Sequence, residues 1–186
     1  MPDPAPPGRW RLLSSRTILA DQWLRIDAER LETPQGVIID PWYLARGTSW
    51  ACALASVPDG RVIMVEQYRR GLDAVVLELP AGMIDDGEEP AVAARRELRE
   101  ESGYEADAEG IALGCWSAEP AHNTVRAHGF VFRVGATAGA LTLDTAEHLH
   151  ALLFTHEQME ELIRTGRFCH GVQIAYWYAA RARKLL

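Results

Sequence analysis

The stretch from Gly82 to Tyr104 constrains this chain more than any other part of it. It joins a glycine-containing loop to a short helix rich in arginine and glutamate. Pro90 suits the first turn of a helix, where its missing N–H costs nothing, and Glu88 and Glu89 suit the positive end of the helix dipole. The sequence therefore predicts a helix that begins near Glu89.

Three carboxylates gather on one side of this helix. The 3.6-residue period places Ala94 and Leu98 on one face and Glu97, Glu100 and Glu101 beside it. Carboxylates this close repel one another by roughly a few tenths of a kcal/mol per exposed pair, so the helix gains nothing unless a cation lies among them. A solvated face with salt bridges is one interpretation. The spacing favours the other, because hard oxygen ligands on a rigid element beside a glycine loop are typical of Mg²⁺ or Mn²⁺ sites in phosphate chemistry.

The same stretch carries a family signature. Gly82, five residues, Glu88, seven residues and then Arg96-Glu97-Leu98-Arg99-Glu100-Glu101-Ser102-Gly103-Tyr104 resembles the motif of the Nudix hydrolases, G-x5-E-x7-R-E-U-x-E-E-x-G-U. Every fixed position is filled, although Tyr104 stands where that family more often has an aliphatic residue. The resemblance implies an α/β/α sandwich and an enzyme that cleaves a diphosphate with the help of a divalent metal ion.

The resemblance also implies roles for individual residues. Glu97, Glu100 and Glu101 are expected to bind Mg²⁺, or Mn²⁺, together with the backbone carbonyl of Ala81. Glu100 is also counted with the catalytic residues, as is Arg96, which is expected to orient a glutamate rather than to touch substrate. In the ADP-ribose pyrophosphatase branch a loop glutamate well after the motif serves as general base. Glu147 occupies the matching place here, and a solvent-exposed loop residue or a metal ligand are the alternatives for it.

Substrate choice depends on residues outside the motif. Pro120, sixteen residues after it, resembles a marker of the ADP-ribose pyrophosphatases, although an ordinary turn would explain it too. Arg69 and Glu78 are candidates for contacts with the terminal ribose or a phosphate. Trp42 is a candidate for stacking on a base, with a core aromatic as the alternative.

The expected reaction is hydrolysis of the pyrophosphate of a nucleoside diphosphate sugar, ADP-ribose first, to AMP and ribose 5-phosphate. GDP-mannose or another nucleoside diphosphate-linked substrate is the alternative within the family. A domain that senses a nucleotide without cleaving it is the alternative from another class.

Charge and composition narrow the partners. The net charge of −7 argues against a nucleic-acid or anionic-membrane surface. Residues 82–104 hold seven acids and three arginines, a local balance of −4, so a phosphate substrate there calls for a metal ion. Three separated cysteines form neither a zinc motif nor a disulfide framework, which indicates a reducing cytoplasm. No apolar run reaches membrane-spanning length, and the first residues lack the features of a signal peptide.

The predicted organisation is an α/β chain in three parts. Residues 1–9 are expected to be a disordered lead, 10–45 a small antiparallel sheet that forms a homodimer, and 46–186 the Nudix-type domain with a mixed sheet between helices. A capping box at Thr155 predicts a helix that ends at Gly166. A last helix is expected from about Val172 to Lys184, and the aromatics of its inner face are expected among Tyr176, Trp177 and Tyr178. Strands are expected over Trp50–Val57, Arg61–Tyr68, Val75–Leu79, Ile111–Ser117, Thr124–Val134 and Leu149–Phe154.

Overall fold

A computed structural model describes residues 8–141, 143 and 148–186 of the chain. It divides into two compact units. One is built from the residues up to Thr48 together with Glu119–Val125, and the other from Ser49–Ala118 together with Arg126–Leu186. In the described part of the chain no helix is long and apolar enough to cross a membrane.

The first unit contains the predicted antiparallel sheet. Its strands β1 (Arg11–Ala20), β2 (Arg25–Glu32) and β3 (Ile38–Arg46) pair in the order β1-β2-β3. On the central strand the carboxylate of Asp27 accepts hydrogen bonds from Arg25 and Arg46, at 2.8 and 2.7 Å. These two guanidinium groups lower the pKa of Asp27 to about 2. The small sheet of the expected fold class is thereby confirmed.

The second unit is built on a mixed sheet of seven strands. Its main path runs β10-β5-β4-β9-β8, with β6 on β5 and β7 on β4, and the β4–β9 pair is parallel while the other pairs are antiparallel. The strands are β4 (Trp50–Ser56), β5 (Val62–Arg69), β6 (Ala74–Glu78), β7 (Ala81–Met83), β8 (Ile111–Trp116), β9 (Ala127–Arg133) and β10 (Leu149–Phe154).

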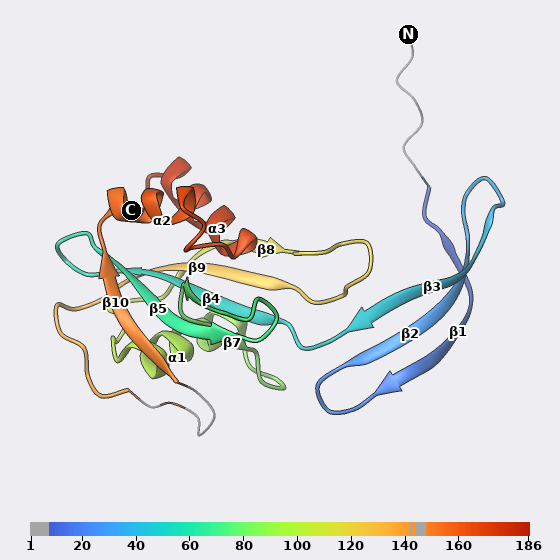
Figure 1. The fold of residues 1–186 in the computed structure, drawn as a ribbon, viewed down its shortest axis with the longest axis horizontal. Helices are drawn as coiled ribbons and strands as arrows, with labels where there is room; N and C mark the ends of the chain where they lie inside the picture. Colours follow the sequence, from blue (N-terminus) through green and yellow to red (C-terminus); the bar gives the residue numbers. More distant parts are fainter. Residues whose placement is uncertain (1–7, 142, 144–147) are drawn as a thin grey trace, which may run out of the picture. The chain divides into compact units, whose positions relative to one another are not determined.

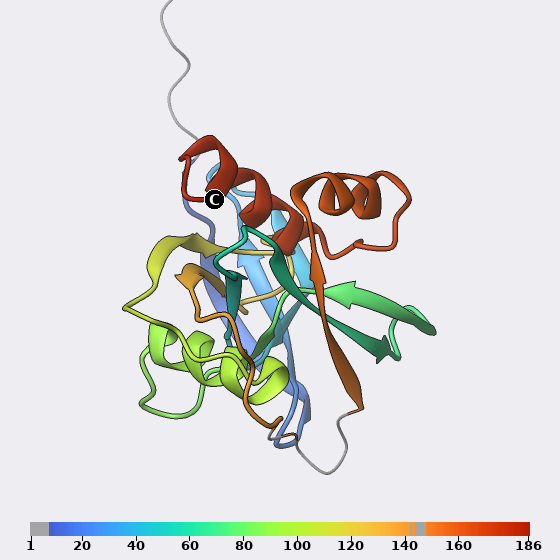
Figure 2. The same ribbon diagram turned by 90° about the vertical axis from the view of Figure 1, so that its left-hand side faces the viewer.

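Helices cover both faces of this sheet, as the α/β/α expectation requires (Figures 1 and 2). Helix α1 (Pro90–Ser102) lies on one face, and α2 (His156–Arg164) and α3 (Gly171–Ala182) lie on the other. The predicted capping box of α2 is present, since Thr155 accepts from the Gln158 N–H and Gln158 accepts from the Thr155 N–H. The predicted fold class is therefore confirmed for this unit as well.

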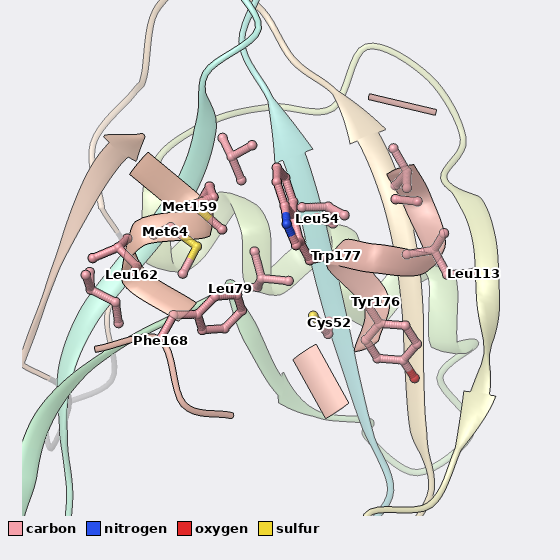
Figure 3. Packing of buried hydrophobic residues seen from close by; sticks show 14 of the residues in the cluster. Cys52, Leu54, Met64, Leu79, Leu113, Met159, Leu162, Phe168, Tyr176 and Trp177 are labelled. Atoms are coloured by element: carbon pink, nitrogen blue, oxygen red, sulfur yellow. The ribbon is translucent and has the colours of Figure 1, made fainter. Parts of the chain in front are cut away.

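The period of two along β4 divides the core into two parts. Ala51, Ala53 and Ala55 point to the α1 side, whereas Cys52 and Leu54 point to the side of α2 and α3. Figure 3 shows that second side filled by large side chains, which include Phe168, Tyr176 and Trp177.

The aromatic inner face of α3 was predicted, and one strand was missed. Of the three candidates for that face, Tyr176 and Trp177 are fully buried, whereas Tyr178 is 44% exposed. Three consecutive aromatics cover too much of the helix circumference for all of them to point inward. The three-residue strand β7 was not predicted, because Ala81–Met83 is too short to show a period of its own.

Candidate active site

Helix α1 begins and ends where its sequence requires. Pro90 occupies the first turn, and Gly103 ends the helix in the left-handed region at φ 72°. Its buried face carries two alanines, Ala93 and Ala94, and Leu98, and these pack in one cluster with the alanines of β4. Small side chains on both elements let the helix backbone approach the sheet closely. This close approach places Glu97 and Glu101, which lie beside the buried face, against strand β7.

Two of the predicted ligands lie against β7. Glu101 is 3% exposed, and its Oε2 accepts a hydrogen bond from the backbone N–H of Ala81 at 2.8 Å. Glu97 lies over Gly82 so closely that a Cβ at this glycine would be 2.1 Å from Glu97 Oε1. The glycine of the motif is required because a carboxylate occupies the place of its side chain.

Arg96 is the cation that lies among the carboxylates. Its guanidinium donates to Glu88 at 2.9 and 3.0 Å, to Glu97 at 2.6 Å and to Glu100 at 3.2 Å, and also to the carbonyl of Met83 at 2.9 Å. These carboxylates raise the pKa of Arg96, and the Arg96 hydrogen bonds lower the pKa of Glu88. Arg96 thus bonds Glu88, Glu97 and Glu100, and Glu101 instead accepts from the Ala81 N–H.

The donor set fits a hard divalent cation in its chemistry. Glu97, Glu100, Glu101 and the Ala81 carbonyl offer oxygen ligands alone, which suit Mg²⁺ and Mn²⁺. Within the described residues, no group of three or more His, Cys, Asp or Glu side chains is arranged to hold a metal ion. To share one ion, Glu97 and Glu100 would turn from Arg96 toward Glu101.

The predicted substrate residues Arg69 and Glu78 are brought together. The Arg69 guanidinium donates to Glu78 Oε2 at 2.5 and 2.9 Å, and the Gln67 side chain donates to the same oxygen at 3.2 Å. Glu78 is buried, whereas the Arg69 side chain is 43% exposed. The pair can therefore present a cation to a ligand while the carboxylate holds it in place.

Gln173, which was not predicted as a site residue, bonds the segment between Glu78 and β7. Gln173 of α3 is buried, accepts from the Leu79 N–H at 2.7 Å and donates to the Leu79 carbonyl at 3.3 Å. It thus ties α3 to the segment that leads into Ala81. Burial raises the pKa of the Cys52 thiol, and the charges of Glu101 and Glu78 raise it further. Helical periodicity marks Gln173 only as a polar residue, so its long-range contact left no signal in the sequence.

Of the other predicted residues, Trp42 and Pro120 belong to the first unit. In the first unit the Trp42 ring stacks on His122, with centroids 4.3 Å apart, and its Nε1–H donates to the Ala121 carbonyl at 3.3 Å. Trp42 is thus held beside the segment that contains the exposed Pro120. Glu147, the predicted general base, lies outside the described residues.

Comparisons with families of known proteins match both parts of the chain. A family model for the NUDIX domain matches residues 46–174. A model for the nucleoside diphosphate sugar hydrolase N-terminal domain matches residues 10–44.

Individual proteins show the same likeness. The chain is 32% identical over 96 residues to an ADP-ribose pyrophosphatase of Bacillus subtilis, and this alignment covers 52% of this chain and 51% of the relative. It is 32% identical over 112 residues to an ADP-sugar pyrophosphatase of Mus musculus, with 54% and 51% covered. A methanol dehydrogenase activator of Bacillus methanolicus is 31% identical over 97 residues, with 52% of each chain covered. The matches thus span about half the length of these relatives.

A solved structure shares the fold over nearly the whole chain. The crystal structure of an ADP compounds hydrolase superposes with a TM-score of 0.82 over 96% of both chains, at 22% identity. This likeness concerns the fold alone.

Proposed function

Because the chain belongs to the Nudix hydrolase family, we propose that it hydrolyses the pyrophosphate bond of nucleoside diphosphate sugars in a Mg²⁺-dependent reaction, with ADP-ribose as the first substrate. The products would be AMP and ribose 5-phosphate. The match of residues 10–44 to the N-terminal domain of nucleoside diphosphate sugar hydrolases supports this substrate class, as do the relatives named ADP-ribose and ADP-sugar pyrophosphatase.

The observation that carries the proposal is the placement of Glu97 and Glu101 against Ala81 and Gly82. Burial costs each carboxylate its hydration, and Arg96 beside Glu97 and the Ala81 N–H at Glu101 offset that cost and hold the two carboxylates in place. Nudix hydrolases generally use divalent metal ions, and Glu97, Glu100, Glu101 and the Ala81 carbonyl would hold them here. A bound ion supplies charge neutralisation for the diphosphate and lowers the pKa of an attacking water.

The side chains around these ligands have separate tasks. Arg96 holds Glu88, Glu97 and Glu100 in one network, so it positions carboxylates and is itself kept from the substrate by the bonds it makes. Arg69, fixed by Glu78, offers a cation for a phosphate or for the terminal ribose. Glu147 is proposed as the general base that removes a proton from the attacking water. Trp42 and Pro120 are proposed to contribute to binding of the nucleoside.

The test is a substrate panel with defined products. Purified protein is incubated with Mg²⁺ or Mn²⁺ and ADP-ribose, GDP-mannose, UDP-glucose, NADH or dGTP, and the products are separated by chromatography. We expect AMP and ribose 5-phosphate from ADP-ribose at the highest kcat/KM. A higher kcat/KM on GDP-mannose would replace ADP-ribose with that substrate.

A nucleotide sensor is the second candidate, and one observation favours it. Glu97 and Glu100 bond Arg96, and among the described residues no group of three or more His, Cys, Asp or Glu side chains is arranged to hold a metal ion. Tight binding of one nucleotide with no turnover of any panel member would establish the sensor and remove the hydrolase.

The general base is tested separately by Glu147→Gln. The amide cannot accept a proton, so kcat is expected to fall by about a hundredfold or more while the melting temperature stays unchanged. A fall of less than about threefold would remove Glu147 from catalysis, since a general base contributes about 10²–10⁴ to the rate.

We also propose that the chain forms a homodimer through its N-terminal sheet and that it acts in the cytoplasm. The first unit exposes large apolar side chains, among them Leu12, Ile18 and Trp23 at 55%, 48% and 67%. Exposed apolar surface of this kind marks an interaction site. Light scattering should give twice the chain mass of 20.7 kDa, and Ile18→Glu should shift the mass toward that of one chain.

A further inference from the structure

A pocket of about 480 Å³ lies at the beginning of α3, in the second unit. Its walls include Trp116 and Ser117 at the end of β8, and His170, Gly171 and Ala175 at the start of α3. Its volume falls in the range of about 300–1,000 Å³ that is common for small-molecule sites. None of the carboxylates of α1 lines it, so this pocket is distinct from the proposed metal site.

Two buried polar atoms without partners belong to residues of this pocket. In the described part of the chain, Ser117 Oγ and His170 Nδ1 are the buried side-chain atoms that make no hydrogen bond. Leaving such an atom unpaired costs about 1–3 kcal/mol, so native structures generally provide it with a partner. Both residues line the same pocket, but the two atoms are themselves buried, so a side chain has to rotate before its polar atom can meet a ligand there.

The lining indicates an uncharged ligand with several hydroxyl groups. No Asp, Glu, Lys or Arg is found among the described residues that line the pocket. Burial lowers the pKa of His170, which favours the neutral form of its imidazole. A hydroxyl group both donates and accepts, and it can therefore pair with Ser117 and with either tautomer of His170. One face of Trp116 is already stacked on Tyr176 with centroids 4.3 Å apart, which leaves no aromatic sandwich for a base.

One residue of the pocket, His170, contacts β4, the strand that pairs with β7. The His170 ring meets the Trp50 ring edge to face with centroids 5.2 Å apart. Trp50 is the register partner of Met83, whose carbonyl accepts from Arg96. The charges of Glu78 and Arg69 also act on His170. His170 thus links the pocket to the Arg69–Glu78 pair by charge and to β4 by a ring contact.

We propose that this pocket binds the sugar on the far side of the diphosphate from the nucleoside, with Ser117 and His170 as hydrogen-bonding partners of its hydroxyl groups. The inference rests on the proposed function for its substrate. It adds two residues that determine which sugar is accepted.

The test compares two ligands that differ in this sugar. ADP and ADP-ribose are titrated calorimetrically with Mg²⁺ present into the wild type, Ser117→Ala and His170→Ala, and ADP-ribose is supplied as the analogue with a methylene group in place of the bridging oxygen, so that nothing is turned over. We expect the wild type to bind ADP-ribose more tightly than ADP. Each substitution should weaken ADP-ribose by about fivefold, the loss of one hydrogen bond, and leave ADP unchanged.

Two further variants guard the interpretation. Ala175→Leu narrows the pocket from an exposed helix position, so it should weaken ADP-ribose without harm to folding. His150→Ala, at an exposed position of β10, should bind both ligands as the wild type does. Melting curves of all four variants identify any that fail to fold.

Three outcomes would overturn the inference. Equal weakening of ADP and ADP-ribose would assign the pocket to the nucleoside half, and unchanged affinity in Ser117→Ala, His170→Ala and Ala175→Leu would remove it from binding. Wild-type protein that binds both ligands equally would show that the sugar gains nothing from the pocket. Turnover of ADP-ribose is measured separately with Mg²⁺, so an inactive protein with the expected binding pattern would refute the proposed function alone.

Discussion

The two faces of the main sheet are built from side chains of different size, although they share one strand. On the α1 face, β4 contributes Ala51, Ala53 and Ala55, while its other face contributes Cys52 and Leu54. The α1 side is packed with small residues so that the helix lies close, and the opposite side is filled by aromatic and aliphatic side chains (Figure 3). We infer that the first face fixes the geometry of the carboxylates and that the second supplies much of the apolar burial.

The largest effect is expected on the α1 face, from Glu101→Gln. Glutamine keeps an oxygen that can accept from the Ala81 N–H, but it lacks the charge that a metal ligand needs. We expect kcat to fall by about a hundredfold or more, since metal charge contributes several kcal/mol to such reactions. The melting temperature should stay near that of the wild type. A normal kcat at saturating Mg²⁺ would remove Glu101 from the ligand set.

The substitution Gly82→Ala tests whether activity depends on the position of Glu97 separately from the stability of the fold. The new methyl group would meet the Glu97 carboxylate, which is the flexible end of a side chain and can move aside. The free energy of unfolding should therefore change by about 1 kcal/mol or less, whereas kcat/KM should fall by about tenfold because a ligand is displaced. Steady-state kinetics and urea unfolding on the same sample measure both. An active Gly82→Ala enzyme would show that the position of Glu97 is not critical.

A pair of neighbouring substitutions compares the two faces directly. Ala53→Leu overfills the α1 side and should cost about 1–3 kcal/mol of stability. It should also reduce kcat/KM by about tenfold, since α1 must move outward and carry the glutamates with it. Leu54→Ala opens a cavity on the other side and should cost about 2–5 kcal/mol. Its folded molecules should retain a kcat/KM within about twofold of wild type, because distant sites act independently.

Urea unfolding and kinetics of both variants decide the matter. Equal losses of activity per kcal/mol of destabilisation in Ala53→Leu and Leu54→Ala would contradict the division of tasks between the faces.

The smallest expected effects are those of acid pH on the free energy of unfolding. His170 and Glu88 should contribute in different pH ranges. Burial lowers the pKa of His170 below its usual 6.5, so its contribution to stability is complete above pH 6.5 and is lost as the pH falls toward the lowered value. Arg96 lowers the pKa of Glu88 below 4.5, so that contribution is present above pH 4.5 and is lost as the pH falls through the lowered value.

Urea unfolding as a function of pH measures both contributions. His170→Gln should flatten the stability profile just below pH 6.5, and Glu88→Gln should flatten it below pH 4.5. Profiles that keep the wild-type slope in these windows would show that neither group is responsible.

Much of the secondary structure could be predicted from local sequence patterns. The beginning of α1 at Pro90, the capping box at Thr155 and the three strands of the first unit follow from local chemistry, and all are present. The order of strands in the seven-stranded sheet, by contrast, depends on pairings between distant segments, such as β4 with β9. No local pattern encodes such a pairing.

In the candidate site, too, the residues of the local motif could be predicted from the sequence, but the contacts between distant segments could not. The motif placed Glu97, Glu100 and Glu101 on one helix, but the way Arg96 bonds its neighbours depends on the approach of α1 to β7. The contact of Gln173 with Leu79 spans 94 residues and has no local signature. Glu147 stays a prediction, since it lies outside the described residues.

The dependence of ADP-ribose cleavage on added metal tests the central claim most directly. Protein treated with EDTA and then dialysed is mixed with ADP-ribose, and AMP is measured by chromatography before and after addition of Mg²⁺ or Mn²⁺. We predict no AMP above background without metal, AMP and ribose 5-phosphate in equal amounts with it, and no restoration by Mg²⁺ in Glu101→Gln. Cleavage at the same rate in metal-free protein, or in Glu101→Gln, would contradict the assignment of the carboxylates of α1 as the metal-binding centre of this enzyme.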